Sequence, residues 1–177
     1  MGVEFVEVFI MAVKKNDEKT IYRLAREKKN LSRAEASELT GLEDYKIERI
    51  ETEKTKADPW DVVAMADAYK NPQLCNYFCS NECPIGMKYV PEIKVKDLAQ
   101  VVLEMLASLN TMEERQKRLI EITADGVIQN EELADFVAIQ QNLAKISTMA
   151  DTLQLWTEQM LAEGRIDSKQ YKALTKK

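Results

Sequence analysis

The chain has 177 residues, of which 45 % are hydrophobic and 31 % charged, so it can build a packed core and is not a disordered chain. It has 5 glycines, 4 prolines and no histidine, which disfavours a β-sandwich or a phosphate-binding glycine loop and excludes a Ser-His-Asp triad or a His-ligated metal. The formal net charge is −5, so nucleic-acid binding would have to rest on a local surface rather than on the charge of the whole chain.

Residues 1–18 are expected to form a tail before the first domain. Glu4 and Glu7 and the absence of a basic start make this stretch a poor signal peptide. Nowhere does the sequence approach an uninterrupted apolar run of about 18 residues, so no membrane span is expected. Three cysteines without a secretion signal suit a reducing compartment, and we expect a cytoplasmic protein.

Residues 19–70 follow the helical period, and their boundaries are marked by capping residues. Asn30 ends the first helix, because asparagine tolerates the left-handed conformation found at helix C-termini. Ser32 and Glu35 have the spacing of a capping box and begin the second helix, which Gly41 ends. These signals predict short helices separated by tight turns.

Two further helices complete this region. A third helix over residues 43–51 places Ile47 and Ile50 on one face, toward the core. Pro59 opens the fourth helix in its first turn, where a missing backbone N–H costs nothing. With the cysteine-bearing segment that follows, we expect an all-α domain of five helices over residues 19–85 and a domain junction between residues 85 and 91.

A second domain is expected over residues 92–177. Apolar residues recur there at a spacing of 3–4 positions, which fits heptads and predicts two long helices in an antiparallel hairpin. One hairpin cannot bury both of its faces, so we expect it to pack on the first domain or on a partner subunit and to act as an oligomerisation domain. The predicted rows are Leu98, Val102, Met105, Leu109, Met112 and Leu119, then Phe136, Ile139, Leu143, Ile146, Ala150, Leu153 and Met160.

Ser37 and Gly41 have the spacing that a helix-turn-helix requires. A small residue inside one helix and a turn residue four positions later let two helices cross closely. At this point the sequence resembles the Cro/repressor-type (XRE-like) helix-turn-helix regulators, which implies a lambda-repressor-like N-terminal domain. The matching residues are 26–32, Glu35, Leu39, Gly41, Leu42, Ile47 and 49–51.

The resemblance also implies roles for particular residues. In this family an arginine that ends the first helix pairs with a glutamate after the recognition helix, and the match assigns this structural pair to Arg26 and Glu51. Double-stranded DNA is the implied partner, and a chain with no evident nucleophile–base pair is not expected to be an enzyme. The residues assigned to DNA contact are Arg33, Tyr45, Lys46, Arg49, Lys54 and Lys56.

The expected recognition helix departs from the family in its charge. It begins with Glu43 and Asp44, and carboxylates that face phosphates are repulsive. Basic and acidic residues are equal in number over residues 19–70. Two interpretations follow: a DNA-binding transcriptional regulator that forms a homodimer through its C-terminal helices, or a helix-turn-helix fold that serves as a protein–protein interaction module without DNA binding.

Cys75, Cys79 and Cys83 would share one face of a continuous helix, because they lie four residues apart. Three thiolates could hold Zn²⁺ or an iron–sulfur cluster, with Glu82, water or a second copy supplying the fourth ligand. Structural zinc sites usually have four protein ligands, however, which favours the alternative that these cysteines are small apolar residues and that no cofactor is bound.

Overall fold

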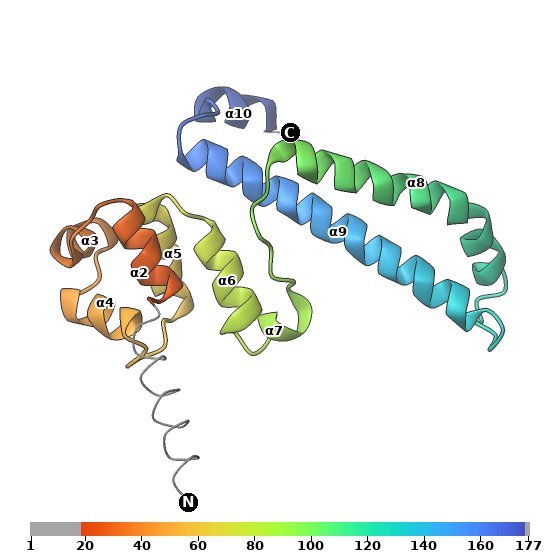
Figure 1. Ribbon diagram of the computed structural model, residues 1–177, viewed down its shortest axis with the longest axis horizontal. Helices are drawn as coiled ribbons and strands as arrows, with labels where there is room; N and C mark the ends of the chain where they lie inside the picture. The colour runs from red at the N-terminus through yellow and green to blue at the C-terminus, as the bar shows by residue number, and fades with distance from the viewer. Residues whose placement is uncertain (1–18, 176–177) are drawn as a thin grey trace, which may run out of the picture. The chain divides into compact units, whose positions relative to one another are not determined.

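The computed structural model describes residues 19–175, and this part of the chain is helical, with no strand (Figure 1). The expected tail over residues 1–18 lies outside the described residues. Backbone contacts divide the chain into an N-terminal unit that ends at Cys75 and a C-terminal unit that begins at Asn76. Within residues 19–175, each helix is too short or too polar to cross a membrane.

Capping residues set the ends of the helices in the N-terminal unit, as the sequence predicts. Asn30 and Gly41 adopt positive φ angles of 56° and 73°, and the Ser32–Glu35 capping box is present. Asp58 and Asp61 form a second capping box, which was not predicted, at the start of the helix that begins with Pro59. The helices are α2 (Ile21–Lys28), α3 (Arg33–Thr40), α4 (Asp44–Glu51) and α5 (Pro59–Tyr69).

The core of the N-terminal unit forms where α4 packs on α2 and α3, and where α5 packs on α2 and α3. Ile47 and Ile50 of α4 are buried, which confirms the inward face predicted for this helix. The rest of the core comes from α2, α3 and α5, from the loop before α5 and from the helix that follows α5. The remaining core residues are Tyr22, Ala25, Ala36, Ala57, Val62, Met65, Ala66, Tyr69 and Leu74.

The boundary between the units falls inside α6 (Gln73–Asn81), whereas the sequence placed it between residues 85 and 91. The Asn76 side chain explains the difference: its amide donates to the Pro91 carbonyl at 3.1 Å, and its oxygen accepts from the Ile93 N–H at 2.8 Å. Short α7 (Gly86–Tyr89) also lies against α6, where a Cβ at Gly86 would collide with the backbone of Cys79. These contacts attach the latter half of α6 to the C-terminal unit.

The C-terminal unit is dominated by the expected antiparallel hairpin of α8 (Leu98–Thr123) and α9 (Leu133–Ala162), drawn side by side in Figure 1. The Asn142 amide donates to the Ser108 carbonyl at 3.0 Å, and Arg118 Nε lies 2.8 Å from Asp135 Oδ2. These contacts fix which turns of the two helices face each other. A last short helix, α10 (Ser168–Thr175), follows.

The contact line between α8 and α9, here called the seam, differs from the predicted heptad rows on α8. Val101 and Ile122 are fully buried, whereas Val102 and Leu109 keep 39 % and 44 % of their surface exposed. Met105, Met112 and Leu119 of the predicted row are partly buried, so these positions agree with the prediction, whereas Val102 and Leu109 are replaced in the seam by the residues that precede them.

On α9 a polar residue is buried in the seam, and the apolar residue that follows it is exposed. Ile139 is buried as predicted, but Asn142 is buried and Leu143, which the heptads placed inside, is exposed. A buried amide is tolerated where its hydrogen bonds are made, and the Ser108 carbonyl supplies a partner for Asn142.

Candidate nucleic-acid interface

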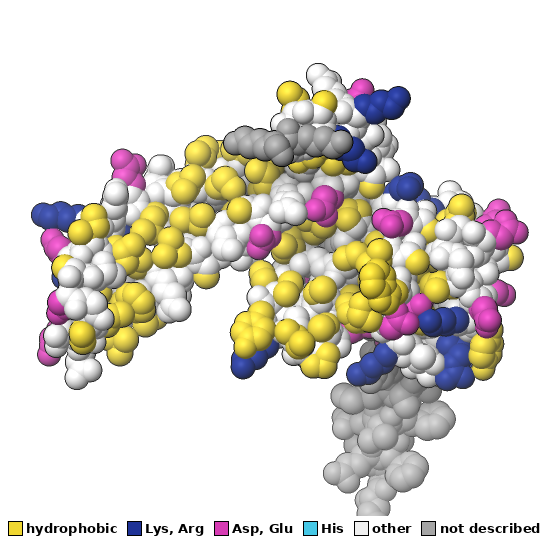
Figure 2. Space-filling model, turned by 180° about the vertical axis from the view of Figure 1, so that it is seen from behind, with side chains coloured by type: hydrophobic (Ala, Val, Ile, Leu, Met, Phe, Trp, Pro, Cys, Tyr) yellow, Lys and Arg dark blue, Asp and Glu magenta, His cyan; other side chains and the backbone are white. Residues whose placement is uncertain are grey.

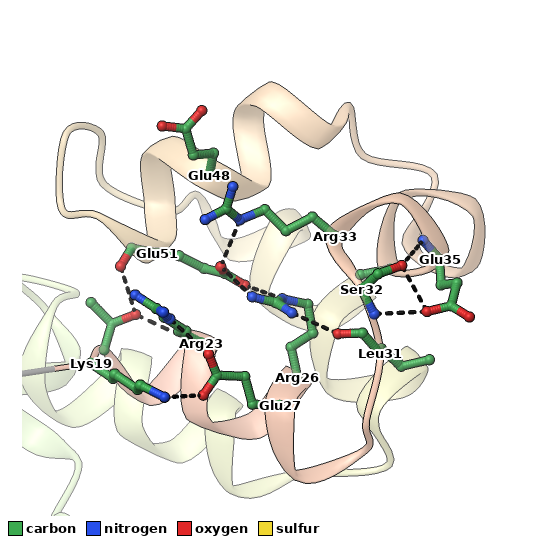
Figure 3. Close-up of polar contacts among 12 residues, drawn as sticks. Lys19, Arg23, Arg26, Glu27, Leu31, Ser32, Arg33, Glu35, Glu48 and Glu51 are labelled. Atoms are coloured by element: carbon green, nitrogen blue, oxygen red, sulfur yellow. Dashed lines mark hydrogen bonds and ion pairs between the residues drawn. The ribbon is translucent and has the colours of Figure 1, made fainter.

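A buried ion pair ties α2 to the end of α4 (Figure 3). Arg26 donates from Nε and Nη2 to the two carboxylate oxygens of Glu51, at 2.6 and 2.8 Å, and from Nη1 to the Leu31 carbonyl at 2.6 Å. The hydrogen bond to Glu51 raises the pKa of Arg26 above its usual value. This two-pronged pair is the one that the resemblance implied, and it fixes the orientation of α4.

Arg33, at the first position of α3, reaches the same carboxylate (Figure 3). Its Nε lies 3.3 Å from Glu51 Oε2, and its side chain remains 38 % exposed. The contact is single and long, and Glu51 is already satisfied by Arg26. The Arg33 guanidinium can therefore exchange Glu51 for an external anion without leaving a buried charge unpaired.

The turn between α3 and α4 is held by the residues that were predicted to form it. Gly41 donates its N–H to the Ser37 carbonyl in a left-handed conformation, and the Ser37 hydroxyl donates to the Leu42 carbonyl at 2.6 Å. Leu42 in turn donates its N–H to Thr40 Oγ1 at 3.2 Å. These bonds set the path by which the chain enters α4.

Tyr45 and Arg49 form a platform on the outer face of α4. Tyr45 is 63 % exposed, and the Arg49 guanidinium lies 5.6 Å from the centre of its ring. Arg49 also donates from Nη1 to the Tyr45 hydroxyl at 3.1 Å, from Nε to Thr55 Oγ1 at 2.7 Å and from Nη2 to the Lys54 carbonyl at 3.3 Å. The loop after α4 thus holds the platform in place.

Lys46 has a structural partner that the sequence analysis did not identify. Its Nζ lies 2.6 Å from Asp61 Oδ1 and 3.3 Å from Asp58 Oδ2, and the hydrogen bond to Asp61 is the main cause of its raised pKa. Asp61 is buried, and the two aspartates cap α5. The Asp58–Asp61 spacing around Pro59 indicates a capping box in the sequence, but which cation approaches these aspartates depends on the tertiary fold.

The remaining residues assigned to DNA lie on the loop that follows α4. Lys54 Nζ lies 3.3 Å from Glu48 Oε1, and Lys56 is exposed. Glu43 and Asp44 are exposed at the start of α4. The outward surface of α4 therefore carries both signs of charge, and most of its cations have an intramolecular partner.

The three cysteines do not lie on one continuous helix. Cys75 and Cys79 belong to α6, but Cys83 comes after the helix ends at Asn81, and all three are partly buried. Among residues 19–175, no three Cys, Asp or Glu side chains are arranged to hold a metal ion. Metal binding by these cysteines stays a prediction from the sequence.

Comparison of the chain with protein-family models, curated proteins and solved structures finds no significant match.

Proposed function

We propose that the N-terminal unit is a helix-turn-helix DNA-binding domain of the Cro/repressor type and that the chain is a transcriptional regulator. The observation that carries the proposal is the buried Arg26–Glu51 pair, which holds α4 rigidly while Tyr45 on the same helix faces outward. A recognition helix needs this combination of a fixed inner face and a free outer face. The Ser37–Gly41 turn supports the same interpretation.

In this proposal the contacts fall into two classes. Arg33 at the start of α3 binds phosphate, and Lys54 and Lys56 bind the backbone beside the groove. The Tyr45–Arg49 platform approaches base edges, where an arginine reads guanine and an aromatic ring packs on a thymine methyl. Lys46, also assigned to DNA from the sequence, adds positive charge next to this surface while it anchors α4 to α5.

Two copies of the chain act together in this proposal. Helix-turn-helix proteins that bind as dimers place their recognition helices on half-sites about one DNA turn apart. A cytoplasmic homodimer joined by the C-terminal helices meets this requirement.

The test is fluorescence anisotropy of the full chain on a duplex enriched from a random DNA pool by capture on the protein. Arg33→Ala should weaken binding about 10-fold and lower the slope of log affinity against log salt by about one per chain, because it removes a phosphate contact. Lys145→Ala on α9 is the matched control, since it removes an exposed cation outside the proposed surface. Equal affinity and slope for Arg33→Ala would remove Arg33 from the interface.

A second candidate function, a protein-binding module, is favoured by the charges on α4. Lys46 and Lys54 already have carboxylate partners, whereas Glu43 and Asp44 are exposed. An acidic start of this kind complements a basic protein surface.

Charge reversal separates the two candidates. Glu43→Lys/Asp44→Lys should tighten DNA binding if α4 approaches phosphates, because it removes two repulsive carboxylates. If α4 binds a basic protein, the same variant should lose that protein in a pull-down and gain nothing on DNA. The DNA titration thus distinguishes an α4 that approaches DNA phosphates from an α4 that binds a basic protein.

A further inference from the structure

Trp60 is the most exposed of the large hydrophobic side chains that the structure describes, with 82 % of its surface in contact with solvent. Its backbone N–H donates to Asp58 Oδ1 at 2.9 Å, whereas its indole N–H has no hydrogen-bond partner within residues 19–175. Tryptophan combines a large apolar ring with a polar N–H, and it is concentrated at binding surfaces for this reason. Trp60 is therefore a candidate for contact with another molecule.

The first turn of α5 holds the backbone of Trp60 in place. Pro59 occupies the first helical position, and Asp58 Oδ1 accepts from the backbone N–H groups of Trp60 and Asp61, at 2.9 and 3.0 Å. Asp61 Oδ2 accepts in return from the Asp58 N–H at 3.2 Å. Proline restricts the backbone, and the capping box satisfies the N–H groups of this turn. The indole is thus displayed from an ordered helix end, which lowers the entropy lost on binding.

Lys46 joins this end of α5 to one flank of α4. Its Nζ lies 2.6 Å from Asp61 Oδ1 and 3.3 Å from Asp58 Oδ2, the two residues that enclose Pro59 and Trp60 in the sequence. Side chains lean toward the N-terminus of their own helix, so Trp60 leans toward the end of α5 that Lys46 contacts. Trp60 therefore lies beside the flank of α4 that carries Lys46.

Arg33 lies beside the other flank of α4. Lys46 and Glu48 are two positions apart, about 200° around the helix, so they lie on opposite flanks of its outer face. Figure 3 shows the Arg33 guanidinium close to Glu48. The outer face of α4 is thus bordered by the cation of Arg33 on one side and by the indole of Trp60 on the other.

The charges of the N-terminal unit favour a neutral contact with DNA. Lys46 and Lys54 are paired with carboxylates, and Figure 2 shows Lys and Arg side chains beside Asp and Glu side chains over this unit. Counterion release then supplies less affinity for DNA than it would on a uniformly basic surface. An indole N–H can donate to a phosphate oxygen and adds affinity without adding charge.

We propose that Trp60 contacts the DNA backbone on the strand across the major groove from the strand that Arg33 binds. A helix that lies in the major groove has one DNA strand along each of its flanks. The ring of Trp60 packs on a deoxyribose, and its N–H donates to a phosphate oxygen. The inference rests on the proposed DNA-binding function and adds a residue that the sequence did not assign to DNA.

Anisotropy of full-length Trp60→Ala on the enriched duplex tests the contact. Binding should weaken about 10-fold, the effect of one hydrogen bond to a charged group. The loss should be the same at 50 and 200 mM salt, because a neutral side chain releases no counterion, whereas Arg33→Ala lowers the slope. Wild-type affinity in Trp60→Ala would overturn the proposal, and so would a lowered slope, which would mean that Trp60 acts through a neighbouring cation.

Two further variants separate the indole N–H from the ring and from exposed aromatics in general. Trp60→Phe keeps a ring but loses the N–H, so its affinity should lie between those of wild type and Trp60→Ala. Tyr89→Ala is the matched control: it removes an exposed aromatic side chain of α7, outside the N-terminal unit, and should bind as tightly as wild type. Far-UV circular dichroism should show the same helix content in every variant, since both aromatic side chains are exposed.

The fluorescence of Trp60 reports the contact directly. The chain has two tryptophans, so Trp156→Phe leaves Trp60 as the single emitter. Acrylamide should quench Trp60 strongly in the free chain, and the duplex should lower the quenching constant about 2-fold or more, because the ring becomes covered. If Trp156→Phe fails to fold, the affinity and salt slope of Trp60→Ala decide alone.

The outcomes separate this contact from the DNA-binding proposal. A chain that binds the duplex while Trp60 stays equally accessible to acrylamide would refute the contact and leave DNA binding standing. A folded wild-type chain that does not bind DNA would refute both.

Discussion

The two units of the chain differ in the polar groups that they bury. In the N-terminal unit, short capped helices enclose an apolar core and a fully partnered ion pair, Arg26–Glu51. In the C-terminal unit, two long helices bury the amide Asn142 between them while leucines such as Leu106 remain exposed. Both units leave large apolar side chains exposed, such as Trp60 in the first and Leu106 in the second, so the units differ in how they use buried polar groups rather than in whether their apolar surface is covered.

The buried polar groups have different structural roles in the two units. Arg26 and Glu51 lie 25 positions apart in the sequence and join α2 to α4, and their charges compensate each other. Asn142 bonds to one backbone carbonyl and thereby selects the register of the hairpin at a cost in stability. The first arrangement positions a surface, and the second aligns two helices.

The largest expected effect comes from breaking the ion pair of the N-terminal unit. Glu51→Ala leaves Arg26 buried without a carboxylate and should lower the free energy of unfolding by about 4 kcal/mol. Glu48→Ala on the same helix, which removes only the exposed pair with Lys54, should cost less than about 0.5 kcal/mol. Urea unfolding followed by circular dichroism measures both, and equal losses would mean that the buried pair does not hold α4.

In the C-terminal unit Gly86 of α7 lies directly against the backbone of α6. Gly86→Ala would drive a Cβ into the backbone of Cys79 and should lower the free energy of unfolding by about 3 kcal/mol. Gly126→Ala is the control: it has free space and only a positive φ of 74°, so about 1 kcal/mol is expected. Thermal unfolding compares the two, and a Gly86→Ala chain as stable as wild type would contradict the close contact.

A smaller effect of opposite sign is expected in the core of the N-terminal unit. The Tyr69 hydroxyl is fully buried and has no hydrogen-bond partner among residues 19–175, and burial raises its pKa to about 12. Tyr69→Phe removes this unsatisfied group and should raise the free energy of unfolding by about 1 kcal/mol. Tyr45→Phe, which loses only an exposed contact with Arg49, should be close to neutral. A destabilised Tyr69→Phe chain would show that the hydroxyl does find a partner.

The smallest expected effect is a pH dependence on the exposed surface of α2. Hydrogen bonds from Lys19 and then Arg23 lower the pKa of Glu27 from 4.5 to about 2. The stabilisation is therefore present above pH 4.5 and is lost as the pH falls toward 2. Acid titration of wild type against Glu27→Gln measures this contribution. Identical pH profiles over that window would show that these exposed contacts do not affect folding.

The helix boundaries of the N-terminal unit could be predicted because each depends on residues next to it in the sequence. Asn30, Gly41 and the Ser32–Glu35 box act through their own turns. The Arg26–Glu51 pair required more, since its members are distant in sequence, and it was reached only through the resemblance. Local chemistry thus determines the ends of helices, and long-range pairs need knowledge of the fold.

The predictions that failed concern which side of a helix faces a neighbour. The predicted row of α8, which begins at Leu98, and the observed row share Met105, Met112 and Leu119, and they differ where Val101 rather than Val102 is buried. The hydrogen bond of Asn142 to the Ser108 carbonyl accompanies the observed row, and the spacing of apolar residues contains no information about such a bond. The partners of Lys46 were missed for a similar reason, since they lie on the next helix.

The proposal that α3 and α4 bind DNA is tested most directly by titrating the wild-type chain on the enriched duplex at 50 and 200 mM salt. If two copies each neutralise about three phosphates, affinity should fall roughly 10³-fold between these salt concentrations, and binding should exceed that to a scrambled duplex. No binding at micromolar protein in 50 mM salt, by a folded chain, would contradict the proposal and leave the protein-binding function as the explanation of the acidic α4.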